Sequence, residues 1–145
     1  PRPGHAALTW ILPRFMEAYS ALHRAGYAHS VEVWDGEGHL AGGLYGVATD
    51  GVFFTESQFT RQRDASKVAF VTLNCHLEKW GYSLNDGKAM TAHLATLGMR
   101  EIPRKEFNAV LAAHTNPVQA PGSWHPDPDL DVAAWMPGKK TTVKS

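Results

Sequence analysis

Two Asp-Gly pairs divide residues 31–56 into three short segments. Asp35-Gly36 begins one turn and Asp50-Gly51 forms another, and glycine after aspartate is typical of tight hairpin turns. Within the segments, side chains alternate with the period of a strand, as in Val31-Glu32-Val33-Trp34. The pattern therefore predicts an antiparallel meander with strands at residues 31–34, 39–49 and 52–56.

A change of period at Ala65 predicts the longest helix of the chain. Ala65, Ala69, Leu73 and Leu77 recur at helical spacing, and Gly81 suits the end of the helix. An earlier helix is predicted over residues 13–25, because proline fits a first helical turn and apolar residues then recur at helical spacing. The other predicted elements are a strand at 82–86, a helix at 90–97, an extended piece at 99–103 and a helix at 105–113.

The order of these elements predicts an α+β fold, with a mixed, mainly antiparallel sheet layered by helices. This order fits the acyltransferase fold of the acetyltransferase (GNAT) superfamily, although a fold alone does not give a function. A chain of 145 residues is long enough to bury a core of its own. We assign residues 1–114 to an acyltransferase-like domain and residues 115–145 to an irregular, proline-rich tail.

The ionisable residues argue against several classes of protein. Basic and acidic residues number 14 each, which does not favour nucleic-acid binding through bulk charge, although a local basic face stays open. The eight histidines are scattered with no pair four residues apart, so no metal site is expected. Cys75, the single cysteine, lies in the apolar stripe of the long helix and is expected to be a small buried hydrophobe. No apolar run is long enough to cross a membrane and no signal peptide is evident, so we expect a cytoplasmic protein.

The linker that leads into the long helix is basic and contains no glycine. Coenzyme A transfer needs a glycine-bearing loop at this point, so that backbone N–H groups can hold the pyrophosphate. Arg61, Arg63 and Lys67 surround the helix start and suit a bound phosphate. The alternative is a helix capped by Asp64, with the basic side chains in solvent.

Six short motifs follow one another along the chain. They are His29-Ser30-Val31-Glu32-Val33-Trp34, Gly42-Gly43-Leu44-Tyr45-Gly46-Val47, Phe54-Thr55-Glu56-Ser57-Gln58-Phe59, Ala65-Ser66-Lys67, His93-Leu94 with Thr96-Leu97-Gly98, and Glu101-Ile102-Pro103-Arg104. In this order and at this spacing they resemble the motifs of the leucyl/phenylalanyl-tRNA–protein transferase family. The resemblance extends from about Thr9 to Phe107.

The resemblance implies both a reaction and its partners. Family members carry a mixed sheet of the acetyltransferase type and move leucine or phenylalanine from tRNA to the N-terminal lysine or arginine of a protein, which marks that protein for degradation. They use neither metal nor coenzyme A, so no cofactor is expected. The resemblance implies a donor, the 3′ end of an aminoacyl-tRNA, and a protein or peptide acceptor. We expect a monomer with no membrane partner, and predict that tRNA binds to Arg61, Arg63, Lys67 and Arg104.

Family members also carry a small N-terminal domain, then a first strand and helix, before the part that matches this chain. The chain begins at Pro1 and has neither, so we expect it to be a partial sequence.

By position, Glu56 and Asp86 match two carboxylates of the family site. Glu56 matches the glutamate of a G-E-S-x-F motif, where it can hold a cationic amine or help to remove its proton. Asp86 matches the aspartate of a D-x-Q motif, which orients the glutamine that is taken to activate the attacking amine. Without the resemblance, Glu56 could be a strand-end glutamate facing water, and Asp86 could be part of an Asn-Asp-Gly turn.

Lys88 stands where the family has the glutamine of that motif. An amide both donates and accepts hydrogen bonds, whereas a protonated lysine only donates. Lys88 could relay a proton if desolvated, could stabilise the oxyanion that forms on the ester, or could mark loss of the family reaction. Thr55 also replaces a glycine and Gln58 replaces the usual methionine, which alters the shape of the pocket more than its chemistry.

Aromatic residues and their neighbours are expected to form the pocket for the transferred amino acid. The predicted substrate-binding residues are Trp34, Phe53, Ser57, Gln58 and Phe59. Phe70 is a further aromatic candidate, and both Phe53 and Phe70 also fit an ordinary core. Two other functions stay open, namely aminoacyl transfer to a small-molecule amine and a catalytically degenerate homologue that binds tRNA or peptide.

Overall fold

The computed structural model describes residues 11–49, 51–113, 124–136 and 141–144. The helices are α1 (Pro13–Arg24), α2 (Ala65–Lys79), α3 (Ala92–Thr96) and α4 (Arg104–Ala113). The strands are β1 (Ala28–Trp34), β2 (Leu40–Thr49), β3 (Val52–Thr60), β4 (Leu84–Asp86), β5 (Glu101–Ile102) and β6 (Thr141–Lys144). They pair in the order β1-β2-β3-β4-β6-β5, with the first three antiparallel and the remaining pairs parallel.

The predicted α+β class is confirmed, and so is the predicted three-stranded meander. Strands β1 and β3 are longer than the sequence pattern indicates, because their backbone pairing continues past the alternating residues. The long helix ends before Gly81, whose φ of 81° is a conformation that glycine adopts without strain. The likeness of this fold to acetyltransferases stays a prediction.

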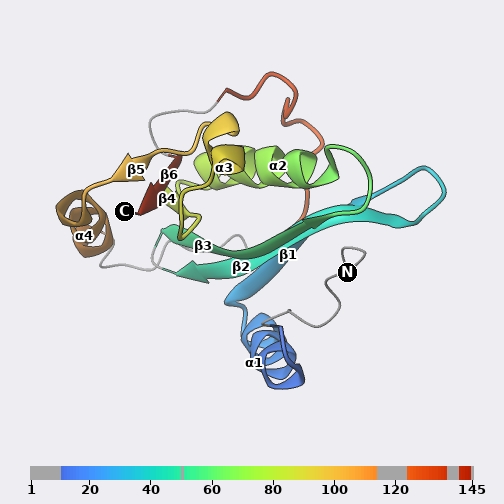
Figure 1. Cartoon of the computed structure of the whole chain (residues 1–145), viewed down its shortest axis with the longest axis horizontal. Coiled ribbons are helices and arrows are strands. Elements are labelled where there is room, and N and C mark those ends of the chain that lie inside the picture. The colour runs from blue at the N-terminus through green and yellow to red at the C-terminus, as the bar shows by residue number, and fades with distance from the viewer. Residues whose placement is uncertain (1–10, 50, 114–123, 137–140, 145) are drawn as a thin grey trace.

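The sheet is covered on both faces (Figure 1). Helix α2 lies along one face, and α1 lies against the other. Phe53 of β3 meets Phe70 and Leu73 of α2 in the main core, and each of these side chains is 1% exposed or less. Burial of side chains of this size contributes roughly 1.5–3 kcal/mol each. A second cluster beneath α4 joins Val52, Leu84, Ile102 and Phe107.

Gly46 allows this core to approach the backbone of β2. A Cβ atom at this position would lie 2.5 Å from the Phe53 ring and 2.2 Å from the Phe54 carbonyl oxygen. Any larger residue would therefore displace the ring, the strand or both.

Among the described residues beyond His114, one segment departs from the predicted irregular backbone. The backbone was expected to be irregular after His114, but residues 141–144 form β6 between β4 and β5. Three of these four residues are β-branched, which favours a strand. The strand forms at this place because β4 and β5 are there to pair with it. The division of the chain at residue 114 stays a prediction.

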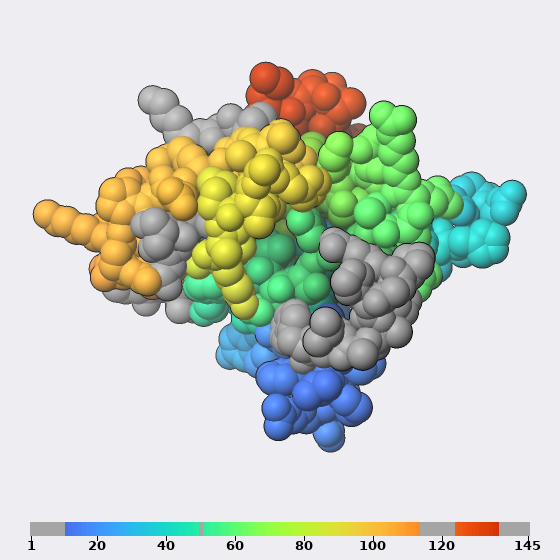
Figure 2. Space-filling view, viewed as in Figure 1, coloured from blue at the N-terminus to red at the C-terminus, as the bar shows by residue number. Residues whose placement is uncertain are grey.

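Residues 124–136, here called the C-terminal strap, lie beside α2 (Figure 2). The Asp127 N–H donates to Nε2 of His76 at 2.9 Å, and Asp127 also forms an ion pair with Lys79. The Trp135 indole donates to Glu78 at 3.1 Å. The ring of Trp124 stacks on His29 of β1 at 3.9 Å, so the strap connects α2 to the meander.

Candidate functional site

Glu56 occupies an irregular position in β3. Tyr45 pairs with Ser57 and Gly46 pairs with Thr55, so Glu56 is an extra residue with no partner on β2. Such a bulge bends the strand and redirects its side chains, and bulges are common beside functional sites.

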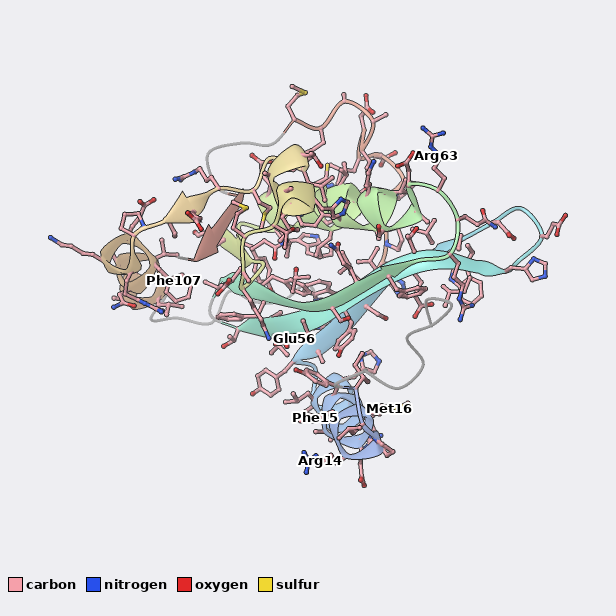
Figure 3. The ribbon with its side chains drawn as sticks, in the orientation of Figure 1. Arg14, Phe15, Met16, Glu56, Arg63 and Phe107 are labelled. Carbon is pink, nitrogen blue, oxygen red and sulfur yellow. The ribbon has the colours of Figure 1, made fainter. Side chains whose placement is uncertain are left out.

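Glu56 and Asp86 lie on the face of the sheet that α2 does not cover. Thr55 donates to the Asn85 side chain at 2.8 Å, and Asn85 donates to Asn74 of α2 at 3.1 Å, which defines the α2 face. Residues alternate in a strand, so Asp86, which pairs with Phe54, belongs to the opposite face. Glu56, two residues beyond Phe54, lies on that same face and contacts helix α1 (Figure 3).

Lys88 brings the two carboxylates into one cluster. Its backbone N–H donates to Oδ1 of Asp86 at 2.7 Å, and its Nζ forms an ion pair with Glu56. The lysine side chain is 49% exposed and the glutamate only 11%. The backbone φ of Lys88 is 67°, a strained value for a residue other than glycine and one that is often found at functional sites. The three predicted catalytic residues therefore converge, and the carboxylate of Asp86 holds the turn that aims Lys88.

Two tyrosines complete the surroundings of Glu56, and the sequence did not indicate them. Tyr19 of α1 donates a hydrogen bond to Glu56, and burial together with this carboxylate raises the pKa of Tyr19. Burial and the charge of Glu56 also raise the pKa of Tyr45, whose hydroxyl is buried without a hydrogen-bond partner in the described structure. The two rings meet edge to face at 5.1 Å. In the sequence, Tyr19 looks like one more apolar position of a helix, and nothing marks Tyr45 among its glycine neighbours.

A pocket of about 500 Å³ opens between α1 and the sheet, with Tyr19 and Tyr45 in its wall. We call it the α1 pocket. His23, Arg24, His29 and Glu32 are its other ionisable lining residues. Burial lowers the pKa of His29, which favours its neutral form, while Glu32 accepts a hydrogen bond from Ser30 at 3.2 Å. Because both tyrosines also surround Glu56, the α1 pocket adjoins the carboxylate cluster.

The predicted substrate-binding residues do not form one pocket. Phe53 is fully buried in the core, as is Phe70, which matches the ordinary-core interpretation. Trp34 is 55% exposed and lines a different pocket of about 610 Å³ between β1 and α2, together with Trp80 and Trp124.

Three predicted substrate-binding residues continue β3 beyond the bulge. Ser57 pairs with Tyr45 and Gln58 with Leu44, while Phe59 is 40% exposed at the end of the strand. The side-chain oxygen of Gln58 is buried with no hydrogen-bond partner in the described residues. Of the predicted substrate-binding residues, these three follow Glu56 directly along β3.

The predicted tRNA-binding residues lie in two places. Lys67 forms an ion pair with Asp64 at 2.7 Å and Arg63 reaches the same carboxylate at 3.4 Å, while the Arg61 guanidinium lies over the Phe59 ring. Arg104 lies over the ring of Phe107, at the other end of the molecule from Arg63 (Figure 3).

Asp64 occupies the N-cap position of α2 but makes no side-chain cap hydrogen bond. Its carboxylate is occupied by Lys67 and Arg63 instead, and the hydrogen bond from Lys67 is the main reason that the pKa of Asp64 is lowered.

The remaining expectations concern metal, thiol and membrane chemistry. In the described residues, no three histidine, cysteine, aspartate or glutamate side chains cluster as metal ligands. Cys75 is buried as predicted, and burial raises the pKa of its thiol. No helix in the described ranges is long and apolar enough to cross a bilayer.

Comparison with known proteins gives one consistent result. Residues 1–112 match the family described as leucyl/phenylalanyl-tRNA protein transferase. A protein of that name from Nitrosospira multiformis is 53% identical over 116 residues, which are 80% of this chain and 50% of the relative. The relative from Thiobacillus denitrificans is 51% identical over 124 residues, which are 86% of this chain and 54% of the relative. The relative from Alkalilimnicola ehrlichii is 45% identical over 134 residues, which are 92% of this chain and 52% of the relative. The chain thus spans about half the length of the curated relatives it matches.

Proposed function

Since this chain belongs to the leucyl/phenylalanyl-tRNA–protein transferase family, we propose that it transfers leucine or phenylalanine from aminoacyl-tRNA to the N-terminal arginine or lysine of a protein. The observation that carries the proposal is the convergence of Glu56, Asp86 and Lys88 on one face of the sheet. The product would be a protein marked for degradation in the cytoplasm, and the enzyme would work as a monomer without metal or coenzyme A.

The proposed reaction is attack of an amine on an ester. The acceptor ammonium loses one proton, and its nitrogen bonds to the ester carbonyl carbon. The bond from that carbon to the ribose oxygen then breaks, and this oxygen takes up the second proton of the nitrogen and leaves as the tRNA hydroxyl. We assign to Glu56 the role of holding the amine and receiving its proton, because it is a nearly buried carboxylate that already accepts from Lys88 and Tyr19. Asp86 acts as a positioning residue, since it fixes the backbone of Lys88.

The proposed position of the acceptor follows from the α1 pocket. An amine held at Glu56 would place the side chain of the first acceptor residue beside Tyr19 and Tyr45, at the mouth of this pocket. Glu32 supplies a carboxylate there for the cationic end of arginine or lysine, and the C-terminus of α1 adds a favourable dipole for a cation. Arg24 also lines the pocket, but it is exposed and can turn towards solvent.

The proposed position of the donor lies along the end of β3. Ser57, Gln58 and Phe59 follow Glu56 directly, and Arg61 stacks on Phe59. Gln58 pairs with Leu44 of the α2-side core, so its side chain belongs to the other face of the sheet from Glu56. We place the aminoacyl group by Ser57 and Phe59 and the tRNA phosphates by Arg61, Arg63 and Lys67. A phosphate there must compete with Asp64 for two of the three cations, so we expect this contact to be weak and sensitive to salt. Trp34 stays a predicted ligand contact. Phe53 is fully buried in the core, and Arg104 lies over Phe107 at the other end of the molecule from Arg63, so neither is included in this position.

Transfer of radiolabelled leucine from leucyl-tRNA to a peptide that begins with arginine tests the proposal. A full-length family member serves as the positive control, and Glu56→Gln should reduce the rate roughly 100-fold or more if the carboxylate acts as the base. Absence of peptide labelling by the chain, under conditions where the control enzyme is active, would overturn the proposed function.

A further inference from the structure

The amine of Lys88 already occupies the carboxylate that the acceptor amine needs. Its Nζ is ion-paired with Glu56, which is 11% exposed and is hydrogen-bonded on another side by Tyr19. The side chain of Lys88 is half-exposed, so a large donor can reach it. The Asp86 carboxylate and the left-handed backbone of Lys88 hold the lysine in this direction.

We propose that Lys88 is itself an acceptor, so that the protein aminoacylates its own Lys88 ε-amine when it meets an aminoacyl-tRNA. The inference rests on the proposed function, because the donor and the site are the same. What differs is the acceptor, which is a side-chain amine of this chain and not the N-terminus of another protein.

The chemistry balances without an oxidant, a reductant or a further reactant. The Lys88 ammonium passes a proton to Glu56, and the freed electron pair forms a bond to the carbonyl carbon of the aminoacyl ester. The ester bond to the ribose oxygen then breaks, and the attacking nitrogen loses a second proton. One of the two protons goes to the ribose oxygen, which leaves as the tRNA hydroxyl, and the other is released from Glu56 to solvent. The product is an amide on Lys88 that carries the free α-amine of the transferred amino acid.

The other ion-paired lysines in the described residues lack this environment. Lys67 pairs with Asp64, which is 49% exposed, and Lys79 pairs with Asp127, which is 24% exposed. Only the Glu56–Lys88 pair, among the ion pairs of the described side chains, also contacts a tyrosine with a pKa raised by burial. Holding the amine next to its base and its electrophile replaces a bimolecular encounter, an effect worth several powers of ten in rate.

Labelling without any added peptide tests the inference. The chain is incubated with leucyl-tRNA that carries radiolabelled leucine, then denatured and treated with ribonuclease, and its labelled peptides are located by mass spectrometry. We expect label on the peptide that contains Lys88, stable to hydroxylamine as an amide must be. Lys88→Arg keeps the positive charge but removes the nucleophile, so it should lose label roughly 100-fold, whereas Lys79→Arg should label as the unchanged chain does.

A parallel reaction with the arginine peptide separates this inference from the proposed function. Peptide product without label on Lys88 overturns the inference and leaves the proposed function intact. Label on Lys88 without peptide product supports the inference and overturns protein transfer. Label spread equally over several lysines, or retained in a folded Lys88→Arg variant, overturns self-acylation at this site.

Discussion

At the scale of single residues, the two carboxylates of the candidate site, Glu56 and Glu32, differ in the partners that they already have. Glu56 is occupied by Lys88 and Tyr19, whereas Glu32 accepts a side-chain hydrogen bond from Ser30 and forms no ion pair among the described residues. An incoming amine must therefore displace Lys88 from Glu56. A cationic side chain can reach Glu32 without breaking an ion pair that the described structure shows.

Glu32→Gln is expected to weaken recognition of the first acceptor residue. The KM for a peptide beginning with arginine should rise roughly 10-fold, because a charge-assisted hydrogen bond is lost, while kcat stays nearly unchanged. A peptide beginning with citrulline, which is neutral, should lose much less. Glu37→Gln, at an 84% exposed carboxylate in the β1–β2 turn, is the matched control. Equal losses for both peptides would contradict the placement of the acceptor in the α1 pocket.

His29 is expected to make the fold sensitive to mild acid. Burial lowers the pKa of His29 from 6.5, so near and below pH 6.5 the His29 side chain is protonated more readily in the unfolded chain than in the folded chain. The associated stability is complete above the unfolded pKa and falls as the pH drops towards the folded pKa. His29→Phe keeps a ring against Trp124 but cannot titrate. Its melting temperature should therefore fall less than that of the unchanged chain between about pH 7.5 and 5.5, and equal falls would exclude His29 as the cause.

The sequence predicted only those site residues that lie in a recognisable motif. Glu56, Asp86 and Lys88 were identified by resemblance, and the structure brings them together. Tyr19 and Tyr45 were missed, because their approach to Glu56 depends on how α1 packs against the sheet. No local pattern encodes that packing.

At the scale of elements, local signals predicted α1 to α4 and β1 to β5, whereas β6 and the bulge at Glu56 depend on non-local pairing. Asp-Gly turns and alternation determine β1 to β3 over short distances. Strand β6 pairs with β4 at residues more than fifty positions away in the chain, and the four residues of β6 do not indicate this pairing by themselves. The bulge at Glu56 was equally hidden, because a bulge is a property of two strands in register and not of one segment.

Strand β6 is expected to support the strand that carries Asp86. Thr142 pairs with Asp86 across the β4–β6 ladder, so Thr142→Pro removes a backbone donor beside the site. We expect a loss of roughly 1–3 kcal/mol in the free energy of unfolding for each hydrogen bond broken, measured by urea denaturation, and a lower transfer rate. Thr142→Ser leaves the backbone unchanged and should behave as the parent chain. A proline variant with unchanged stability would contradict the pairing of β6 with β4.

At the scale of the whole molecule, the C-terminal strap connects parts that are distant in the sequence. Trp124 contacts the rings of His29 in β1, Phe53 in β3 and Trp80, the residue that follows α2. The strap thus covers one side of the main core, and its polar contacts with α2 hold it there. The sequence predicted an irregular tail and gave no indication that it would pack on the core.

Trp124→Ala is expected to destabilise the fold by about 3–5 kcal/mol, because a large aromatic side chain is removed from packed surroundings. Trp34→Ala is the matched control, since this tryptophan is 55% exposed, and it should cost less than about 1 kcal/mol. The free energies come from urea denaturation of each variant. Comparable losses for the two variants would show that the strap does not stabilise the core.

The extra residue in β3, Glu56, is not needed for pairing with β2, but it supplies the carboxylate of the proposed reaction. Without Glu56, Thr55 and Ser57 would become consecutive partners of Gly46 and Tyr45, and the ladder would run on regularly. The loss of Glu56 alone would thus leave the β2–β3 pairing intact and remove the carboxylate that we propose as the base.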